Sequence, residues 1–208
     1  MFVGGIAGFL NGVNKSSTHV ANVTNCTNGS ADDTLKGAVL NGSTGAGSWT
    51  TYTGGIVGYY RVLGELKGCN NYGSVKNTSS AQIASSFIHF RLGGIVGSSE
   101  NGTITNCSNA GAVTDDSETN AGCVGGVAGC VAYAAKLTNC DNSGDVTVKF
   151  NSAANPYPMD IAGVVGYAAT AITLDGCDNS GDITNNRTTT ALNIYMGGLL
   201  GEVANVDL

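Results

Sequence analysis

A five-residue pattern, G-G-[IV]-[VA]-G, recurs along the chain and constrains its fold more than any other feature. It occurs as GGIAG from Gly4, GGIVG from Gly54 and Gly93, and GGVAG from Gly125, with the variants AGVVG from Ala162 and GGLLG from Gly197. A cysteine motif follows each of the first five copies: NCTNG (Cys26), GCNNYG (Cys69), NCSNAG (Cys107), NCDNSG (Cys140) and GCDNSG (Cys177). Self-similarity of this kind indicates a repeat architecture.

The spacing within a unit is fixed on one side of the cysteine and variable on the other. From the start of the pattern to the cysteine, the last four complete units span 15, 14, 15 and 15 residues, whereas the cysteine-to-pattern distances are 28, 24, 18, 22 and 20. Solenoids behave in this way because insertions are confined to one side of a framed rung. Short β-type runs separated by Gly, Asn and Asp predict strands and turns.

We therefore expect an all-β fold, a parallel β-helix or β-solenoid of about five to six rungs. Residues 1–208 would form a single repeat solenoid whose units begin near the six positions named above. The chain starts and stops within the repeat, and it lacks the basic start and cleavage site of a signal peptide. We expect it to be a fragment of a longer exported protein, located outside the cell or at the cell surface, with its signal upstream.

Charge and hydropathy disfavour two classes of partner. The net charge is −6 and no run of Lys or Arg occurs, which argues against nucleic acid. No apolar stretch approaches the roughly 18 residues of a membrane span, so we expect no membrane insertion in this segment.

Aligning the units turns single residues into columns. Asparagine stands two places after the cysteine in all five units, at Asn28, Asn71, Asn109, Asn142 and Asn179. Stacked in register, such side chains can form an amide ladder; the alternative is a polar ligand site. The residue before each cysteine is Asn or Gly, which predicts a positive φ. A glycine four places after it, as at Gly73, predicts turn geometry, and a "SADDTLK" insertion delays this glycine to Gly37 in the first unit.

Five of the seven cysteines occupy one column, at Cys26, Cys69, Cys107, Cys140 and Cys177. One thiol per rung does not provide the four convergent ligands of zinc, and parallel Cβ vectors suit a disulfide poorly. We expect a ladder of reduced core thiols. Cys123 and Cys130 fall outside the column. Cys123 aligns with outward positions, which predicts exposure. It would lie about 20 Å from Cys130 along a straight strand, so mutual bridging would need the Gly-Gly bend to fold the two back, and both are expected to be reduced.

Carboxylates provide the remaining candidate site. Asp141 would stack on Asp178 and Asp145 on Asp182, and four carboxylates on two rungs could bind Ca²⁺. The alternative is that these aspartates cap turns. No HExxH, GxSxG or P-loop motif occurs. We expect no catalytic constellation and no cofactor.

The run GGIVG followed by I-T-N-C-x-N-x-G-x-V resembles the GLUG repeat of bacterial secreted and surface proteins. The resemblance implies a β-helical stalk or adhesin-like region. Similar repeats accompany zinc metallopeptidases that cleave immunoglobulin A, but their HExxH helix is absent from this sequence, so only an accessory role could carry over.

Three functions remain open. The first is an extracellular structural or adhesin-like module that binds a host or microbial surface protein or glycan through variable arcs, which include residues 29–53, with Trp49 and Tyr52, and 76–92, with Phe87 and His89. The second is an accessory, substrate-positioning region of a secreted immunoglobulin-cleaving metallopeptidase. The third is a glycan-binding or glycan-active β-helix.

Overall fold

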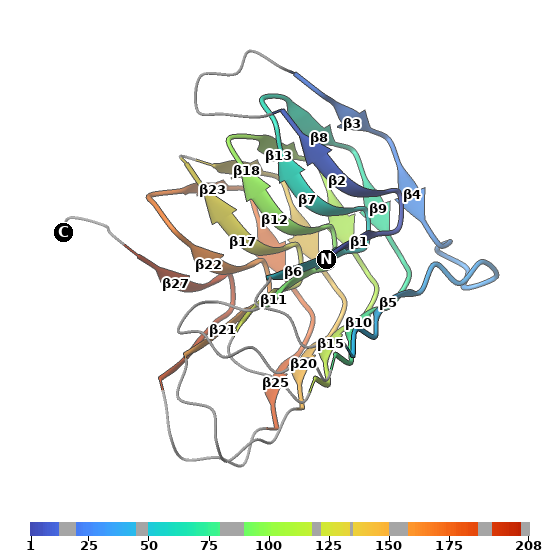
Figure 1. Cartoon of the computed structure of the whole chain (residues 1–208), viewed down its shortest axis with the longest axis vertical. Coiled ribbons are helices and arrows are strands. Elements are labelled where there is room, and N and C mark those ends of the chain that lie inside the picture. The colour runs from blue at the N-terminus through green and yellow to red at the C-terminus, as the bar shows by residue number, and fades with distance from the viewer. Residues whose placement is uncertain are drawn as a thin grey trace.

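The computed structural model describes residues 1–12, 20–44, 50–79, 90–117, 122–133, 135–149, 158–186 and 193–204. Within these ranges the chain forms 27 short strands and no helix. The strands build five sheets, and every strand pairs in parallel with its neighbours (Figure 1). This confirms the predicted all-β parallel solenoid.

Two sheets have six strands each. The first comprises β1 (Phe2–Gly4), β6 (Thr51–Gly54), β11 (Phe90–Gly93), β16 (Gly122–Gly125), β21 (Met159–Ala162) and β26 (Ile194–Gly197). The second comprises β2 (Ala7–Asn11), β7 (Val57–Arg61), β12 (Val96–Glu100), β17 (Ala128–Ala132), β22 (Val165–Ala168) and β27 (Leu200–Val203).

Three sheets have five strands each. One comprises β3 (Val23–Thr24), β8 (Glu65–Lys67), β13 (Thr103–Thr105), β18 (Lys136–Thr138) and β23 (Thr173–Asp175). The next comprises β4 (Thr27–Asn28), β9 (Asn70–Asn71), β14 (Ser108–Asn109), β19 (Asp141–Asn142) and β24 (Asp178–Asn179). The last comprises β5 (Val39–Asn41), β10 (Val75–Asn77), β15 (Val113–Asp115), β20 (Val146–Val148) and β25 (Ile183–Asn185).

Each rung adds one strand to each sheet in the same order, so a strand pairs with the fifth strand after it in the chain. The register keeps the sequence columns aligned: Gly93 pairs with Gly125, and Asn109 with Asn142. Side chains of one column therefore lie one above the other along the axis of the solenoid.

The second glycine of the repeated pattern and the residue after it form a sharp arch between the first two strands of a rung. Only two residues, such as Gly94 and Ile95, separate β11 from β12. The strands fold back on each other so that residues seven apart lie opposite: the rings of Phe2 and Phe9 stack with centroids 4.4 Å apart. Ile95 and Val96, which are neighbours, are both fully buried because they follow this arch.

The buried apolar side chains form two clusters. One lies under the second and third strands of each rung and includes Ile56, Leu66 and Ile104, whereas the other lies between the first and fifth strands and includes Leu92 and Val113. The chain passes between the two clusters at the arch and again at the fourth strand. These two segments are in contact, since the Asn71 amide lies against Gly55. The cross-section is therefore pinched at a waist made of glycine and asparagine.

The turn before each cysteine has the predicted backbone. Positive φ angles of 51° to 62° occur at Asn25, Gly68, Asn106, Asn139 and Gly176. Asn and Gly adopt this left-handed conformation at low cost. The chain can therefore turn sharply between its third and fourth strands in all five units, as expected.

The glycine after the asparagine has a different role from the predicted one. Gly73, Gly111, Gly144 and Gly181 are absent from the positive-φ residues of the described chain. Instead, each approaches the backbone of the preceding rung too closely for a Cβ, with Gly73 against the carbonyl of Gly37. Close packing between rungs, not turn conformation, excludes a side chain here.

The first unit accommodates its insertion as predicted. Val39 pairs with Val75, and the side chain of Asn28 donates to the carbonyl of Gly37, which takes the place of Gly73 in its own unit. The inserted residues carry a local network in which Asp32 accepts from Ser30 and Thr34 at 2.6 and 2.8 Å. These hydrogen bonds lower the pKa of Asp32 to about 2.

Candidate functional site

The asparagine column forms a continuous chain of side-chain hydrogen bonds. The Nδ2 atom of each asparagine donates to Oδ1 of the next, from Asn28 to Asn71 (2.8 Å), Asn109 (2.7 Å), Asn142 (2.8 Å) and Asn179 (2.7 Å). Nδ2 also donates to the carbonyl two residues on, as from Asn109 to Gly111 at 2.8 Å. The three central side chains are buried. Their amides are occupied within the fold, so the column is a structural element.

A second polar ladder was missed by the alignment of the units. Asn41 donates to Asn77, and Asn77 donates to Asp115, both at 3.0 Å and fully or almost fully buried. The column lies two residues after the valine of the G-x-V segment. Extending the alignment by those two residues would have revealed it.

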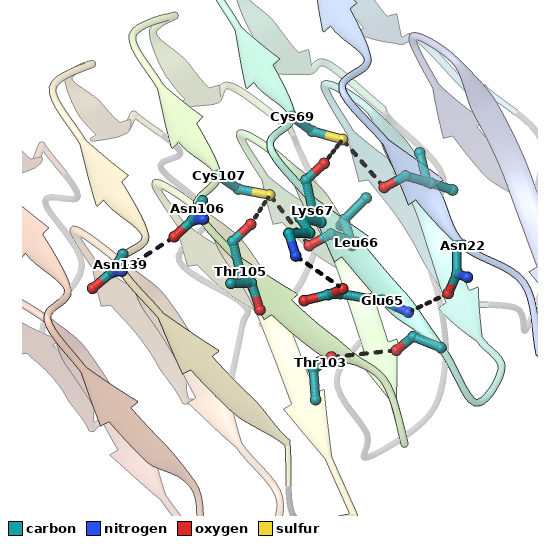
Figure 2. Close-up of polar contacts among 12 residues, drawn as sticks. Asn22, Glu65, Leu66, Lys67, Cys69, Thr103, Thr105, Asn106, Cys107 and Asn139 are labelled. Atoms are coloured by element: carbon teal, nitrogen blue, oxygen red, sulfur yellow. Dashed lines mark hydrogen bonds and ion pairs between the residues drawn. The ribbon is translucent and has the colours of Figure 1, made fainter.

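The column cysteines use their thiols in the same way along the corner of the solenoid. Cys69 contacts the carbonyls of Lys67 and Val23 at 3.4 and 3.5 Å, and Cys107 contacts those of Thr105 and Leu66 at 3.4 Å (Figure 2). Cys69, Cys107 and Cys140 are buried, and the terminal members Cys26 and Cys177 are half-buried. All seven cysteines are free thiols in this structure.

The column thiols differ in proton affinity. Hydrogen bonds with Cys107 lower the pKa of Cys69 to about 6 and also lower the pKa of Cys140. Hydrogen bonds with Cys140 and Cys69, followed by burial, raise the pKa of Cys107. Burial is also the largest cause of the raised pKa values of Cys26 and Cys177. Because the thiolate is the nucleophile and the metal ligand, Cys26, Cys107 and Cys177 are poorly suited to either chemistry. Cys69 and Cys140, whose pKa values are lowered, are buried.

The four calcium candidates lie apart from any ligand cluster. Asp141 pairs in register with Asp178, and all four side chains are exposed. The Oδ1 atom of Asp145 accepts the backbone N–H of Asp182 at 3.2 Å, which is a turn-capping contact between rungs. Across the described ranges, no group of three or more His, Cys, Asp or Glu side chains is arranged to hold a metal ion.

Two outward columns face each other across the arch, and we call the side-chain-filled space between them the arch cleft. One column, on the first sheet, comprises Phe2, Tyr52, Arg91, Cys123, Asp160 and Tyr195. The opposing column, on the second sheet, comprises Phe9, Tyr59, Ser98, Cys130, Tyr167 and Glu202. The cleft runs along the whole described length of the solenoid.

The N-terminal end of the arch cleft is aromatic. The rings of Tyr52 and Tyr59 stack at 4.4 Å, and Phe2 stacks on Tyr52 at 5.2 Å. Arg91 continues the series, with its guanidinium 5.2 Å from the centroid of the Tyr52 ring and its Nη1 donating to Ser98 at 2.9 Å. This end combines partly exposed rings with a cation.

The centre of the arch cleft is polar and closed. Ser98, Cys123, Cys130 and Asp160 are at most 2% exposed. The prediction that Cys123 is exposed is therefore wrong, because its outward strand position faces the opposing strand of the arch rather than solvent. The Gly-Gly bend that would be needed to bring Cys123 back toward Cys130 is present as the arch between β16 and β17.

One carboxyl in the cleft has a strongly shifted proton affinity. Burial, followed by the hydrogen bond and charge of Glu202, raises the pKa of Asp160 to about 8. The thiol of Cys123 donates to Asp160 Oδ2 at 3.5 Å. The folded chain thus favours the protonated form of Asp160 at neutral pH.

Several predicted binding residues fall outside the described ranges: Trp49, Phe87 and His89. Tyr52, from the same arcs, lies in the arch cleft. The first-unit insertion adds a hollow of about 250 Å³ whose lining includes Asp33, Lys36 and Tyr72. Asp33 and Lys36 are ion-paired at 2.9 Å and largely exposed.

The fold and its columns define a class: a parallel β-solenoid of glycine-arched rungs held by amide and thiol ladders. The GLUG motif family matches residues 89–114 and 120–147, which confirms the resemblance derived from the repeats. Two adjoining segments of the chain therefore carry the GLUG motif.

A solved structure shares this fold. It is the crystal structure of "a putative immunoglobulin A1 protease" from Bacteroides ovatus, similar with a TM-score of 0.57 and 19% sequence identity. The alignment covers 95% of this chain and 56% of that one, so this chain spans little more than half of its length. No curated protein sequence matches the chain. In the described residues no helix has the length and hydropathy needed to cross a membrane.

Proposed function

We propose that the chain is a non-catalytic structural and adhesin-like module of a secreted or cell-surface protein, in which a rigid solenoid displays variable segments to a partner. The observation that carries this proposal is the contrast between fixed and variable connections. The arch always has two residues, whereas the connection from the fifth strand to the next rung ranges from six residues (116–121) to twelve (78–89).

Each of these variable connections starts at a strand of one five-stranded sheet and ends at a strand of one six-stranded sheet. They run from β5, β10, β15, β20 and β25 to the six-stranded sheet that begins with β1. Their anchor points are therefore stacked one rung apart along one side of the solenoid (Figure 1). A row of loops on a rigid scaffold is a common arrangement for binding surfaces.

The proposed partner is a host or microbial surface protein or glycan. The acidic chain, with net charge −6, is unsuited to nucleic acid. The polar columns support a non-catalytic role because their groups are engaged in the fold: the asparagines donate to one another, and the column thiols contact backbone carbonyls.

The test replaces the arcs 78–89 and 149–158 with Gly-Ser segments of equal length. Binding of the purified chain to a glycan array and to a panel of surface proteins is measured beside thermal unfolding. We expect partner binding to fall at least tenfold while the unfolding midpoint stays within about 3 °C. Binding that persists unchanged in both replacements contradicts the proposal.

The similarity to the immunoglobulin A1 protease structure favours a second function, an accessory substrate-positioning region of a secreted peptidase. The supporting observation is that the shared fold extends over 95% of this chain. This function predicts that the chain binds immunoglobulin A1 without cleaving it. Biolayer interferometry and gel analysis of the immunoglobulin distinguish the two functions, and binding to glycans alone would favour a third, glycan recognition by the aromatic end of the arch cleft.

A further inference from the structure

Two cysteines occupy opposing strands of one arch. Cys123 lies in β16 and Cys130 in β17, on either side of the two-residue bend. The preceding rungs show how close the two strands are at these positions. A Cβ on Gly97, the residue before Ser98, would lie 2.9 Å from the carbonyl oxygen of Arg91, and the side chains also meet. Ring centroids are 4.4 Å apart for Tyr52 and Tyr59, and Arg91 Nη1 lies 2.9 Å from Ser98 Oγ. Cys123 is in register with Arg91, and Cys130 with Ser98.

The column thiols have a different geometry. Their side chains repeat one per rung, in the same place on each, and their sulfurs contact carbonyls of their own strand and of the preceding rung. Neighbours in a column extend in parallel, which suits a disulfide poorly. Cys123 and Cys130 instead lie on two opposing strands of one rung, and both are at most 1% exposed.

We propose that Cys123 and Cys130 form a disulfide that clips the two strands of their arch together when the chain folds in an oxidising compartment. The site would thus be a cross-strand covalent clip within one rung. The compartment part of this inference rests on the proposed export of the chain, since disulfides persist outside the reducing cytosol. The ability to form the bond depends on the geometry of the arch alone.

The chemistry is thiol–disulfide exchange with a small or protein disulfide as oxidant. One cysteine thiolate attacks the oxidant disulfide, giving a mixed disulfide and releasing one reduced thiol. The second cysteine then attacks the mixed disulfide and releases the other. The two cysteines lose two protons and two electrons, and the oxidant disulfide becomes two thiols.

Because both thiols are buried in the folded chain, the bond must form before folding is complete. Desolvation raises the pKa of both thiols, an effect that the nearby Arg91 opposes. Both sulfurs are also closed off from solvent in the folded chain. Exchange therefore takes place while the arch is still open during folding, and the finished fold then protects the bond.

The test refolds the reduced, unfolded chain in a buffer of reduced and oxidised glutathione, with refolding in dithiothreitol as the control. Free thiols are alkylated, and a tryptic digest is sequenced by tandem mass spectrometry. The peptide 92–136 contains Cys107 as well as the pair, which provides an internal control. We expect Cys107 to be alkylated and Cys123 linked to Cys130. Alkylation of both, or linkage of either to another cysteine, overturns the proposal.

A second measurement tests whether the bond acts as a clip. Closing a loop of this size lowers the unfolding equilibrium constant by roughly fifty-fold. Dithiothreitol should remove this effect in the natural chain and in Cys107→Ser, but should change nothing in Cys123→Ser/Cys130→Ser. A natural chain whose stability is insensitive to dithiothreitol contradicts the clip. Because refolding is performed in vitro, neither result depends on whether the chain is exported.

Discussion

The side-chain amide of Asn109 packs directly against Gly94. The asparagine ladder therefore occupies the space that a side chain at this position of the arch would need. The same contact recurs between Gly55 and Asn71 and between Gly126 and Asn142. The glycine pattern and the asparagine column thus pack against each other to form the narrow waist of each rung.

Replacing the glycine of this waist should destabilise the chain. In Gly94→Ala the new methyl group would overlap the Asn109 amide and the Gly126 carbonyl, and we expect a loss of about 3 kcal/mol in urea unfolding. Gly198→Ala is the matched control, because its Cβ would meet nothing within 4 Å. There we expect no loss, or a gain of up to about 1 kcal/mol. Equal effects in both variants would rule out the waist.

The buried centre of the asparagine ladder should matter more than its end. Asn109→Ala removes donors to Asn142 and Gly111 and an acceptor for Asn71. We expect a loss of about 2–4 kcal/mol, and about 1 kcal/mol for the half-buried Asn179→Ala. Chemical denaturation of both variants provides the comparison, and a larger loss at Asn179 would contradict it.

The insertion of the first unit should be dispensable. Deleting residues 30–36 leaves Asn28-Gly29-Gly37-Ala38-Val39, which has the spacing of Asn71-Tyr72-Gly73-Ser74-Val75 in the next rung. Since Val39 already pairs with Val75, we expect the β-type circular dichroism spectrum to be retained and the free energy of unfolding to change by less than about 1 kcal/mol. An unfolded deletion variant would show that the insertion supports the first rung.

The arch cleft should make stability depend on pH. Asp160 has a pKa of about 8 in the folded chain, against a reference value of 3.8. Between these values the folded state binds more protons than the unfolded state, so stability falls as pH rises, by at most about 1.4 kcal/mol per pH unit for one group. The contribution of Asp160 to the free energy of unfolding is fully present below about pH 4 and has been lost once the pH passes 8.

Thermal unfolding of Asp160→Asn between pH 5 and 9 measures this effect. Because its amide cannot ionise, we expect the variant to be more stable than the natural chain, by a margin that grows as pH rises from 5 to 8 and then levels off. Asp141→Asn, at an exposed position, is the control and should keep the natural pH dependence. If Asp160→Asn also keeps it, the buried carboxyl does not control the pH response.

Much of the fold could be predicted because each rung repeats its constraints. Asn25 and Gly68 share a tolerance of positive φ, which revealed the turn, and the constant position of Asn71 and Asn109 indicated stacking. The arch could not be predicted in the same way, since alternation along the strand placed Cys123 outward but did not show that Cys130 would face it. The Asn41 ladder was overlooked because the aligned unit ended too early.

The asparagine ladder also gives the solenoid an electrical direction. All four contacts run the same way, from Asn28 toward Asn179, so the amide dipoles add along the axis, with the positive end toward the C-terminal rungs. Hydrogen bonds in such a chain polarise one another. Each further rung should therefore strengthen the bonds already present, and stability should rise faster than in proportion to rung number.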